Sequence, residues 1–166
     1  MTVNAQEFRN AMARLGAAVN IITSDGEAGK VGFTASAVCS VTDTPATLLI
    51  CINRNSSSRE ALLANGVVCV NVLSAGQRPV SDIFAGATGV KGAARFEAAE
   101  WQTLATGAPA LVGAIASIDC RISEVIEKGT HSIIFGEVQA IHLGEGHDSL
   151  IYWSRDYHEI QMRKAG

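Results

Sequence analysis

The segment Asn53–Arg59 carries residue types that can bind a phosphate group. It follows an apolar run, and its three consecutive serines stand where a helix is expected to begin. Backbone N–H groups at a helix N-terminus favour an anion, serine hydroxyls add donors, and Arg54 and Arg59 add positive charge. An ordinary serine cap beside two solvated arginines explains the same pattern, so both interpretations stay open on these residues alone.

Hydroxyl side chains also recur in the segment Gly32–Thr42, where small residues alternate with apolar ones. On a strand, Thr34, Ser36 and Ser40 share one face, because side chains two residues apart point the same way. Such a face offers hydroxyl groups and a close approach of the backbone to a flat polar ligand. A Ser/Thr face open to solvent is an equally good interpretation.

Two histidines stand beside expected strand ends. His131 opens an apolar run, and His158 follows Tyr157 near the end of the chain. Neither has an acidic or serine partner in a recognisable triad order, so both are compatible with surface positions as well as with a binding site. The four histidines show no H-E-x-x-H or other close ligand spacing, which gives a metal site little support.

Several familiar motifs are missing from the sequence. It has no G-x-G-x-x-G between a strand and a helix, no G-x-x-x-x-G-K-[ST] and no G-x-S-x-G. Their absence argues against a Rossmann dinucleotide site, a P-loop and a hydrolase elbow. No C-x-x-C occurs, so a zinc ribbon or a thioredoxin-type site is not expected. We expect four reduced, buried cysteines that act as small hydrophobic residues: Cys39, Cys51, Cys69 and Cys120.

Short helices are expected around the candidate residues. Asn4–Leu15 has apolar residues at helical spacing, with Asn4 and Glu7 placed as a capping box and Gly16 as its end. The glycine-rich stretch Gly86–Trp101 is irregular and is expected to form a mobile loop. The other two expected helices are Ser57–Ala64 and Pro79–Phe84.

The remaining apolar runs have the composition of strands, and Ile115–Ile126 and Ser132–Leu143 also show the alternation of half-buried strands. Asp25-Gly26 and Lys128-Gly129 mark turns between neighbouring runs. Mostly antiparallel strands with few helices predict a mainly β fold, a barrel of Greek-key type. A doubly wound sheet needs a regular strand–helix alternation, which is missing. The expected strands are Ala17–Ser24, Val31–Val41, Thr47–Ile52, Val67–Leu73, Ile115–Ile126, Ser132–Leu143 and Leu150–Trp153.

Composition narrows the class of protein. The 166 residues fit one domain, 1–166, and 48% hydrophobic against 17% charged residues excludes intrinsic disorder. With so few charged residues, the surface of a free monomer would be unusually apolar. The composition therefore predicts apolar surface buried against a second subunit or a ligand. A net charge of -3 without a basic run argues against nucleic-acid binding. Without an apolar stretch of ~20 residues or a secretory signal, we expect no membrane association and a cytoplasmic location.

Long blocks of the sequence, taken in order, resemble a known family. They are FRNAMARLGAAVNIITSDGEAGKVGFTASAVCSVTDTPATLLICINRNSSS, VCVNVLSAGQ, ARFEAAEW, GTHSIIFGEV and LIYWSRDYH, and they run from Phe8 to His158. The chain is similar to the flavin reductase-like, FMN-binding split-barrel proteins. Within them it most resembles the reductase components of two-component flavin monooxygenases, of the 4-hydroxyphenylacetate 3-monooxygenase type. A small departure is Pro45-Ala46, where the family often has two prolines.

The resemblance implies a split β-barrel with Greek-key topology and a few short helices, assembled as a homodimer. It also implies NAD(P)H-dependent reduction of FMN or FAD, after which reduced flavin diffuses to a separate oxygenase. Hydride passes from nicotinamide C4 to flavin N5, so the protein must stack two flat rings and needs no acid–base residue of its own. No basic pocket for the 2′-phosphate of NADPH is evident, which favours NADH.

Matching positions give the expected cofactor-binding residues. Those that match the family's segment along the isoalloxazine edge are Thr34, Ala35, Ser36 and Ala37. Those that match positions near the ribityl chain and the phosphate are Ser40, Asn53, Ser56, Ser57 and Ser58. The position close to the flavin is Phe84, and those where the nicotinamide lies over the flavin ring are His131, Tyr157 and His158.

Two other functions stay open beside this one. The chain fits a split-barrel flavoprotein that retains FMN as an oxidase, and it fits a non-catalytic flavin- or haem-binding barrel. Loss of NADH in the presence of free flavin separates the reductase from both.

Overall fold

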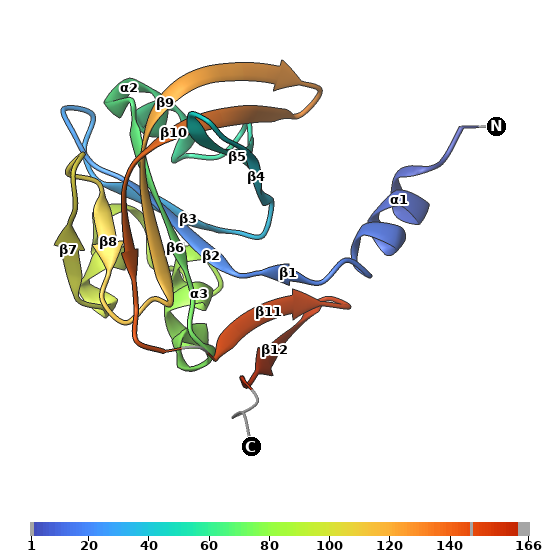
Figure 1. Cartoon of the computed structure of the whole chain (residues 1–166). Coiled ribbons are helices and arrows are strands. Elements are labelled where there is room, and N and C mark those ends of the chain that lie inside the picture. The colour runs from blue at the N-terminus through green and yellow to red at the C-terminus, as the bar shows by residue number, and fades with distance from the viewer. Residues whose placement is uncertain (1, 147, 163–166) are drawn as a thin grey trace.

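A curled antiparallel sheet of seven strands forms the centre of the computed structural model, which describes residues 2–146 and 148–162 (Figure 1). The strand order is β3-β2-β6-β9-β10-β5-β4. The prediction of a mainly β chain with few short helices is confirmed. The strands of this sheet are β2 (Asn20–Ser24), β3 (Val31–Ala35), β4 (Val38–Asp43), β5 (Ala46–Asn53), β6 (Val67–Val72), β9 (Ala116–Lys128) and β10 (His131–Leu143).

The strands β3 and β4 are consecutive in the chain but form the two opposite edges of this sheet. The prediction of one continuous strand, Val31–Val41, is wrong, because the chain changes partners in its middle. β3 pairs with β2 as far as Ala35, and then the carbonyl of Ala37 accepts the backbone N–H of Cys51 on β5. The curl therefore brings the two edges together at residues 36–37 and leaves an unpaired seam between β3 and β4.

The two longest strands, β9 and β10, form the hairpin that the sequence predicted at Lys128-Gly129. Gly129 has a φ of +57°, a left-handed conformation that suits glycine. The pairing register shifts twice along this hairpin, once after Phe135 and once after Val138. Such irregularities bend a strand and increase its twist, which helps these long strands to follow the curl of the sheet.

Branched aliphatic side chains fill the inside of the curled sheet. Alternate residues of β5 point inward, and Leu48, Ile50 and Ile52 are at most 5% exposed. The helix α2 (Arg59–Asn65) packs the fully buried Leu62 against the same cluster. Burial of one such side chain contributes roughly 1.5–3 kcal/mol, so this cluster is a main source of stability.

A second apolar cluster lies outside the curl and contradicts the prediction of a mobile loop at Gly86–Trp101. The helix α3 (Arg78–Phe84) ends in Phe84, whose ring centroid lies 5.0 Å from that of Phe96. Phe96 lies in the 3-10 helix Gly92–Ala98, and the Trp101 ring packs 4.9 Å from it. Three aromatic rings therefore anchor the segment. It is followed by a small hairpin of β7 (Trp101–Thr103) and β8 (Pro109–Leu111), which pairs strands that the sequence did not predict.

The N-terminal helix α1 (Ala5–Met12) projects away from the sheets and has no buried residue (Figure 1). Its predicted capping box of Asn4 and Glu7 is confirmed, but the helix ends at Met12 and not at Gly16. Neither α1 nor any other helix in the described ranges is long and apolar enough to cross a membrane. After it, β1 (Ala17–Ala18) joins the C-terminal strands β11 (Ser149–Trp153) and β12 (Asp156–Ile160) in a separate three-stranded sheet, and β12 was not predicted.

Asn71 of β6 is fully buried, and its amide uses both its oxygen and its nitrogen. Oδ1 accepts the backbone N–H of Leu111 at 2.7 Å and the hydroxyl of Ser117 at 2.8 Å. Nδ2 donates to the carbonyls of Ile21, at 3.1 Å, and Pro109, at 3.3 Å. One side chain therefore links β2, β6 and β9 to the β7–β8 hairpin.

We expect Asn71→Leu to lower the free energy of unfolding by about 3 kcal/mol, because several buried polar groups lose their partner and each such loss costs ~1–3 kcal/mol. Urea unfolding followed by circular dichroism measures the change. Asn55→Leu is the matched control, because Asn55 is exposed and its substitution should change stability by less than about 0.5 kcal/mol. Equal effects of the two substitutions contradict the assignment.

Candidate functional site

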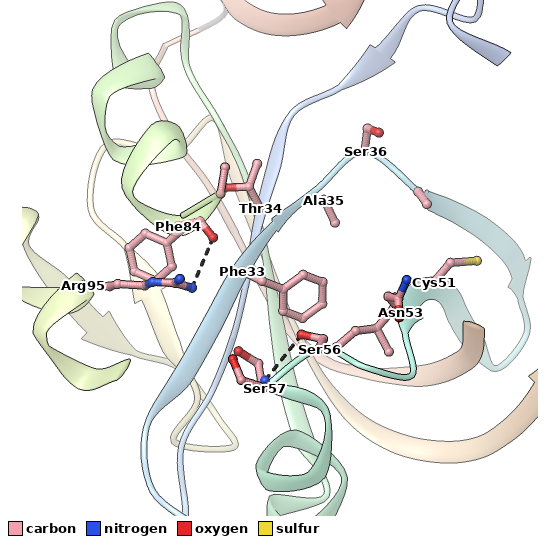
Figure 2. Close-up of a pocket in the computed structure, with 14 residues that line it drawn as sticks. Phe33, Thr34, Ala35, Ser36, Cys51, Asn53, Ser56, Ser57, Phe84 and Arg95 are labelled. Carbon is pink, nitrogen blue, oxygen red and sulfur yellow. Dashed lines mark hydrogen bonds between the residues drawn. The ribbon is translucent and has the colours of Figure 1, made fainter. Parts of the chain in front are cut away.

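A cleft of about 480 Å³ opens where the seam between β3 and β4 begins, and we call it the seam cleft (Figure 2). It lies between the end of β3, the end of β5 and the C-terminus of α3. The predicted binding residues that line it are Thr34, Ala35, Ser36, Ala37, Asn53, Ser56, Ser57, Ser58 and Phe84. The lining residues that were not predicted as binding residues are Phe33, Cys51, Ile52, Ala85 and Arg95.

The end of β3 forms one wall of the seam cleft. The Thr34 hydroxyl donates to the Ser81 carbonyl at 2.7 Å, so its oxygen lone pairs remain for a ligand donor. The Asn20 amide holds the carbonyl of Ala35 at 3.2 Å. Beyond it, Ser36 and Ala37 are exposed and have small side chains. A flat polar group can therefore approach the backbone closely along this wall.

The serine segment, Asn53–Arg59, folds as a tight turn and lies at the other end of the seam cleft from Ser36 (Figure 2). The Ser56 N–H donates to the Asn53 carbonyl at 2.9 Å, and the Ser58 N–H lies 3.4 Å from the Ser56 hydroxyl oxygen. The helix begins at Arg59, two residues later than expected, and the Ser58 hydroxyl makes no capping bond. Ser58 is buried and donates to the Gly32 carbonyl at 3.4 Å. Ser56 and Ser57 are thus the serines whose hydroxyls are left for a ligand.

Arg95 lines the seam cleft but was not among the predicted binding residues, because its segment was interpreted as a mobile loop. Its guanidinium donates to the carbonyls of Val90 at 3.0 Å, Gly32 at 3.1 Å and Phe84 at 3.3 Å. Among the described residues it makes no ion pair, so its positive charge is not neutralised. A further hollow of about 420 Å³ continues from the seam cleft past Ser57 and Arg95 to Lys91. This end of the seam cleft suits a phosphate group.

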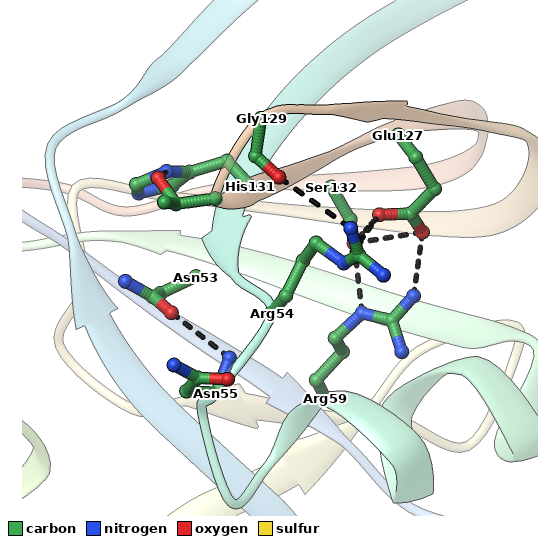
Figure 3. A network of polar contacts seen from close by, with 9 residues as sticks. Asn53, Arg54, Asn55, Arg59, Glu127, Gly129, His131 and Ser132 are labelled. Carbon is green, nitrogen blue, oxygen red and sulfur yellow. Dashed lines mark hydrogen bonds and ion pairs between the residues drawn. The ribbon is translucent and has the colours of Figure 1, made fainter.

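The arginines of the serine segment do not line the seam cleft, contrary to the expectation that they add charge to it (Figure 3). The Glu127 carboxylate on β9 forms ion pairs with both: its Oε2 lies 3.2 Å from Arg54 Nε, and its Oε1 lies 2.5 Å from Arg59 Nη2. The buried Ser132 hydroxyl donates to Glu127 at 3.0 Å and accepts from Arg59 at 2.7 Å. Both arginines therefore tie the serine segment to the β9–β10 hairpin.

The pKa of the Glu127 carboxyl lies below its ordinary value. Partial loss of hydration acts to raise this pKa, but the hydrogen bonds from Arg59 and Ser132, with the charges of Arg59 and Arg54, outweigh it. Because the pKa is lower in the folded chain than in the unfolded one, the network stabilises the fold above about pH 4.5. That contribution is lost as the pH falls through the folded-state pKa.

Four predicted binding residues lie outside the lining of the seam cleft: Ser40, His131, Tyr157 and His158. Ser40 is exposed on β4, and His131 pairs across the strands with Asn53 at the rim. The His158 ring packs 5.5 Å from that of Trp153 and contacts its carbonyl at 3.1 Å. Tyr157 lines a neighbouring cleft that shares Thr34, Ala35 and Ser36 with the first.

The four cysteines are free, as expected, but they are not all buried. Burial raises the pKa of the Cys120 thiol to about 12 and raises that of Cys69 as well. Cys39 is exposed, and Cys51 is half-buried at the seam cleft with a pKa that partial burial raises. Cys39 lies on the edge strand β4, and Cys51 lies on the neighbouring strand β5. In the described ranges no three His, Cys, Asp or Glu side chains gather as a metal site.

The seam cleft combines a bare strand wall at one end with hydroxyls and a guanidinium at the other. Of the described residues that line it, Cys51 and Arg95 alone have ionisable side chains. The thiol is held neutral and the guanidinium stays charged, so the lining offers no acid–base pair. The arrangement fits a ligand with a flat polar ring and a phosphate tail that carries its own reactive atoms.

Comparisons with known proteins agree with this geometry. The protein named FMN reductase (NADH) RutF from Ancylobacter novellus is 54% identical over 164 residues, which cover 99% of this chain and 90% of the relative. The protein of the same name from Escherichia coli K12 is 54% identical over 163 residues, or 98% of each chain. The solved structure of the flavin reductase PheA2 has a TM-score of 0.86 at 29% identity and covers 96% of this chain and 100% of PheA2.

The expected split-barrel fold is thereby confirmed, since the match to PheA2 covers 96% of this chain. A sequence model of the flavin reductase like domain matches residues 12–161. With relatives more than half identical over almost its whole length, this chain belongs to the flavin reductase-like domain family.

Proposed function

We propose that this protein is an NADH-dependent FMN reductase that releases reduced FMN to a separate monooxygenase. The relatives named FMN reductase (NADH) RutF support the activity, because they are 54% identical to this chain over 98–99% of its length. The observation that carries the proposal is the seam cleft, which has a flat strand wall at one end and Arg95 with free serine hydroxyls at the other. FMN likewise has a flat ring at one end, which suits the strand wall, and a phosphate at the other, which suits Arg95 and the serine hydroxyls.

In this assignment the isoalloxazine ring lies along Thr34–Ala37, with its polar edge toward the strand backbone. The phosphate lies at the other end, where Ser56, Ser57 and the Arg95 guanidinium donate to it. Phe84 supports this end indirectly: its side chain is 1% exposed in the aromatic cluster, while its carbonyl holds Arg95. The proposal thus gives Phe84 a positioning role in place of a direct contact with the ring.

Bound flavin supplies the redox chemistry by accepting a hydride from the nicotinamide. The residues of this chain bind the flavin and the nicotinamide and orient their rings, and no side chain has to move a proton. The phosphate meets one unneutralised guanidinium, because Arg54 and Arg59 are committed to Glu127. A modest hold on the phosphate suits a flavin that leaves after its reduction.

The activity test mixes the purified protein with NADH and free FMN in air and follows the NADH absorbance. We expect sustained loss of NADH that depends on added FMN, and no stoichiometric flavin in the protein as purified. A yellow protein that keeps its FMN through gel filtration and does not consume NADH supports the retained-flavin oxidase or the binding barrel instead.

The phosphate assignment predicts different effects on FMN and riboflavin. Ser57→Ala and Arg95→Gln should each raise the KM for FMN about tenfold or more, since a hydrogen bond to a charged group contributes roughly 1.5–3 kcal/mol. The KM for riboflavin, which has no phosphate, should change less than twofold. Arg121→Gln, which removes an exposed guanidinium of β9 outside the seam cleft, is the matched control. Equal losses for FMN and riboflavin mean that these residues support the loops and not the phosphate.

A homodimer is also part of the proposal. Large apolar side chains stay exposed on α1, on the residues just after it and on the adjoining sheet, among them Phe8 at 58%, Leu15 at 63% and Trp153 at 46%. A helix with no buried residue that projects from the body is typical of an arm that packs on a second subunit (Figure 1). The low share of charged residues supports the same conclusion.

Light scattering behind gel filtration tests the assembly. We expect a mass of two 17.4 kDa chains for the wild-type protein, and a shift toward the monomer for Leu15→Glu, because a charge in an apolar interface is strongly unfavourable. A fully active wild-type monomer at micromolar concentration excludes the dimer.

A further inference from the structure

A second cleft, of about 420 Å³, adjoins the seam cleft beside the β11–β12 hairpin, and we call it the hairpin cleft. The two clefts share four residues: Thr34, Ala35 and Ser36 of β3 and its continuation, and Ala85 at the end of α3. In the proposed function the first three lie along the flavin ring. Three of the four shared residues belong to the proposed ring end, so a molecule in the hairpin cleft reaches the flavin ring.

Two guanidinium groups and one carboxylate line the hairpin cleft, which leaves its lining with a net positive charge. Arg78 of α3 stacks over the Tyr157 ring, with its guanidinium carbon 4.8 Å from the ring centroid. Its ion pair with Asp82 is long, at 3.9 Å. The Asp156 carboxylate accepts the backbone N–H of Tyr157 at 2.8 Å. Arg155 completes the set, and each guanidinium keeps donors free, since it has five.

The turn that carries Arg155 has an unusual backbone. Trp153 pairs with Asp156, so Ser154 and Arg155 form a two-residue hairpin turn, with φ of +51° and +63°. Such turns favour Asn-Gly, because a Cβ is strained at positive φ. The Ser154 N–H donates to the Ala13 carbonyl at 2.7 Å, and the Arg155 guanidinium donates to the Asn10 side chain at 2.5 Å. The N-terminal segment thus holds an arginine at a position where glycine is the easier residue.

Aromatic walls give the hairpin cleft a further preference. The Tyr152 and Tyr157 rings pack edge to face with centroids 5.4 Å apart. The Tyr157 hydroxyl lies 3.1 Å from that of the fully buried Ser81, which fixes the ring. A cleft with two guanidinium groups and aromatic walls suits a ligand that combines phosphate groups with flat rings.

We propose that the hairpin cleft binds the diphosphate of NADH through Arg78 and Arg155, an inference that rests on the proposed function. Because the proposed function places the flavin phosphate toward Arg95, the positive charge of the hairpin cleft is left for the other substrate. NADH must place its nicotinamide over the flavin ring, and its diphosphate then extends past Thr34–Ser36 toward the two arginines. Binding energy from this remote group holds the nicotinamide at the reacting distance.

The test compares two hydride donors, NADH and reduced nicotinamide riboside, which has the same nicotinamide and ribose but no phosphate. Arg155→Gln and Arg78→Gln should each lower kcat/KM for NADH about tenfold or more. The same variants should change kcat/KM for the riboside and the KM for FMN by less than twofold. Activity with the riboside also shows that each variant is folded.

Two control variants sharpen the result. Arg121→Gln removes a guanidinium outside both clefts and should leave both donors unchanged. Asn10→Ala removes the contact of Arg155 with α1, and it should affect NADH much less than Arg155→Gln does. Equal loss for NADH and the riboside, or no loss for NADH, overturns the assignment of the diphosphate. A wild-type protein that oxidises the riboside with FMN but not NADH overturns it too, whereas one that oxidises neither donor refutes the proposed function itself.

Discussion

The rest of the structure depends on how one short connection closes the curled sheet. β3 and β4 are the two edges of the sheet, yet Ser36 and Ala37 alone separate them in the chain. Paired edges would seal the barrel with a ladder of hydrogen bonds, whereas the unpaired seam leaves strand backbone open to a ligand. Both clefts lie against this connection, so the same feature that closes the fold also positions the candidate site.

The arginines around the seam differ in whether a carboxylate neutralises them, and this difference separates those with a structural role from the one available to bind a ligand. Arg54 and Arg59 are drawn to Glu127 and fasten the serine segment to the long hairpin. Arg95 instead contacts backbone carbonyls, which orient the guanidinium without neutralising it. A segment held from behind by ion pairs can present its hydroxyls to a phosphate with little loss of conformational entropy on binding.

A flavin reductase of this geometry has little use for acid–base side chains. The seam cleft and the hairpin cleft meet at Thr34, Ala35, Ser36 and Ala85, and the proposed assignment brings the two flat ring systems together there. The chain contributes orientation, which accounts for much of the barrier in a reaction between two bound molecules. In the same assignment the phosphate-bearing ends of FMN and NADH lie on opposite sides of that meeting point.

Local residue patterns by themselves determined most of the elements: the capping box at Asn4 and the turn at Lys128-Gly129 depend on near neighbours. Blocks in family order also indicated the fold and the walls of the seam cleft. Tertiary structure decided what depends on partners distant in the chain. It broke the run Val31–Val41 by pairing its halves with different strands, and it ordered the stretch around Arg95 through aromatic packing. Alternation cannot reveal such a change of partner, and a glycine-rich composition cannot reveal which rings lie beneath it.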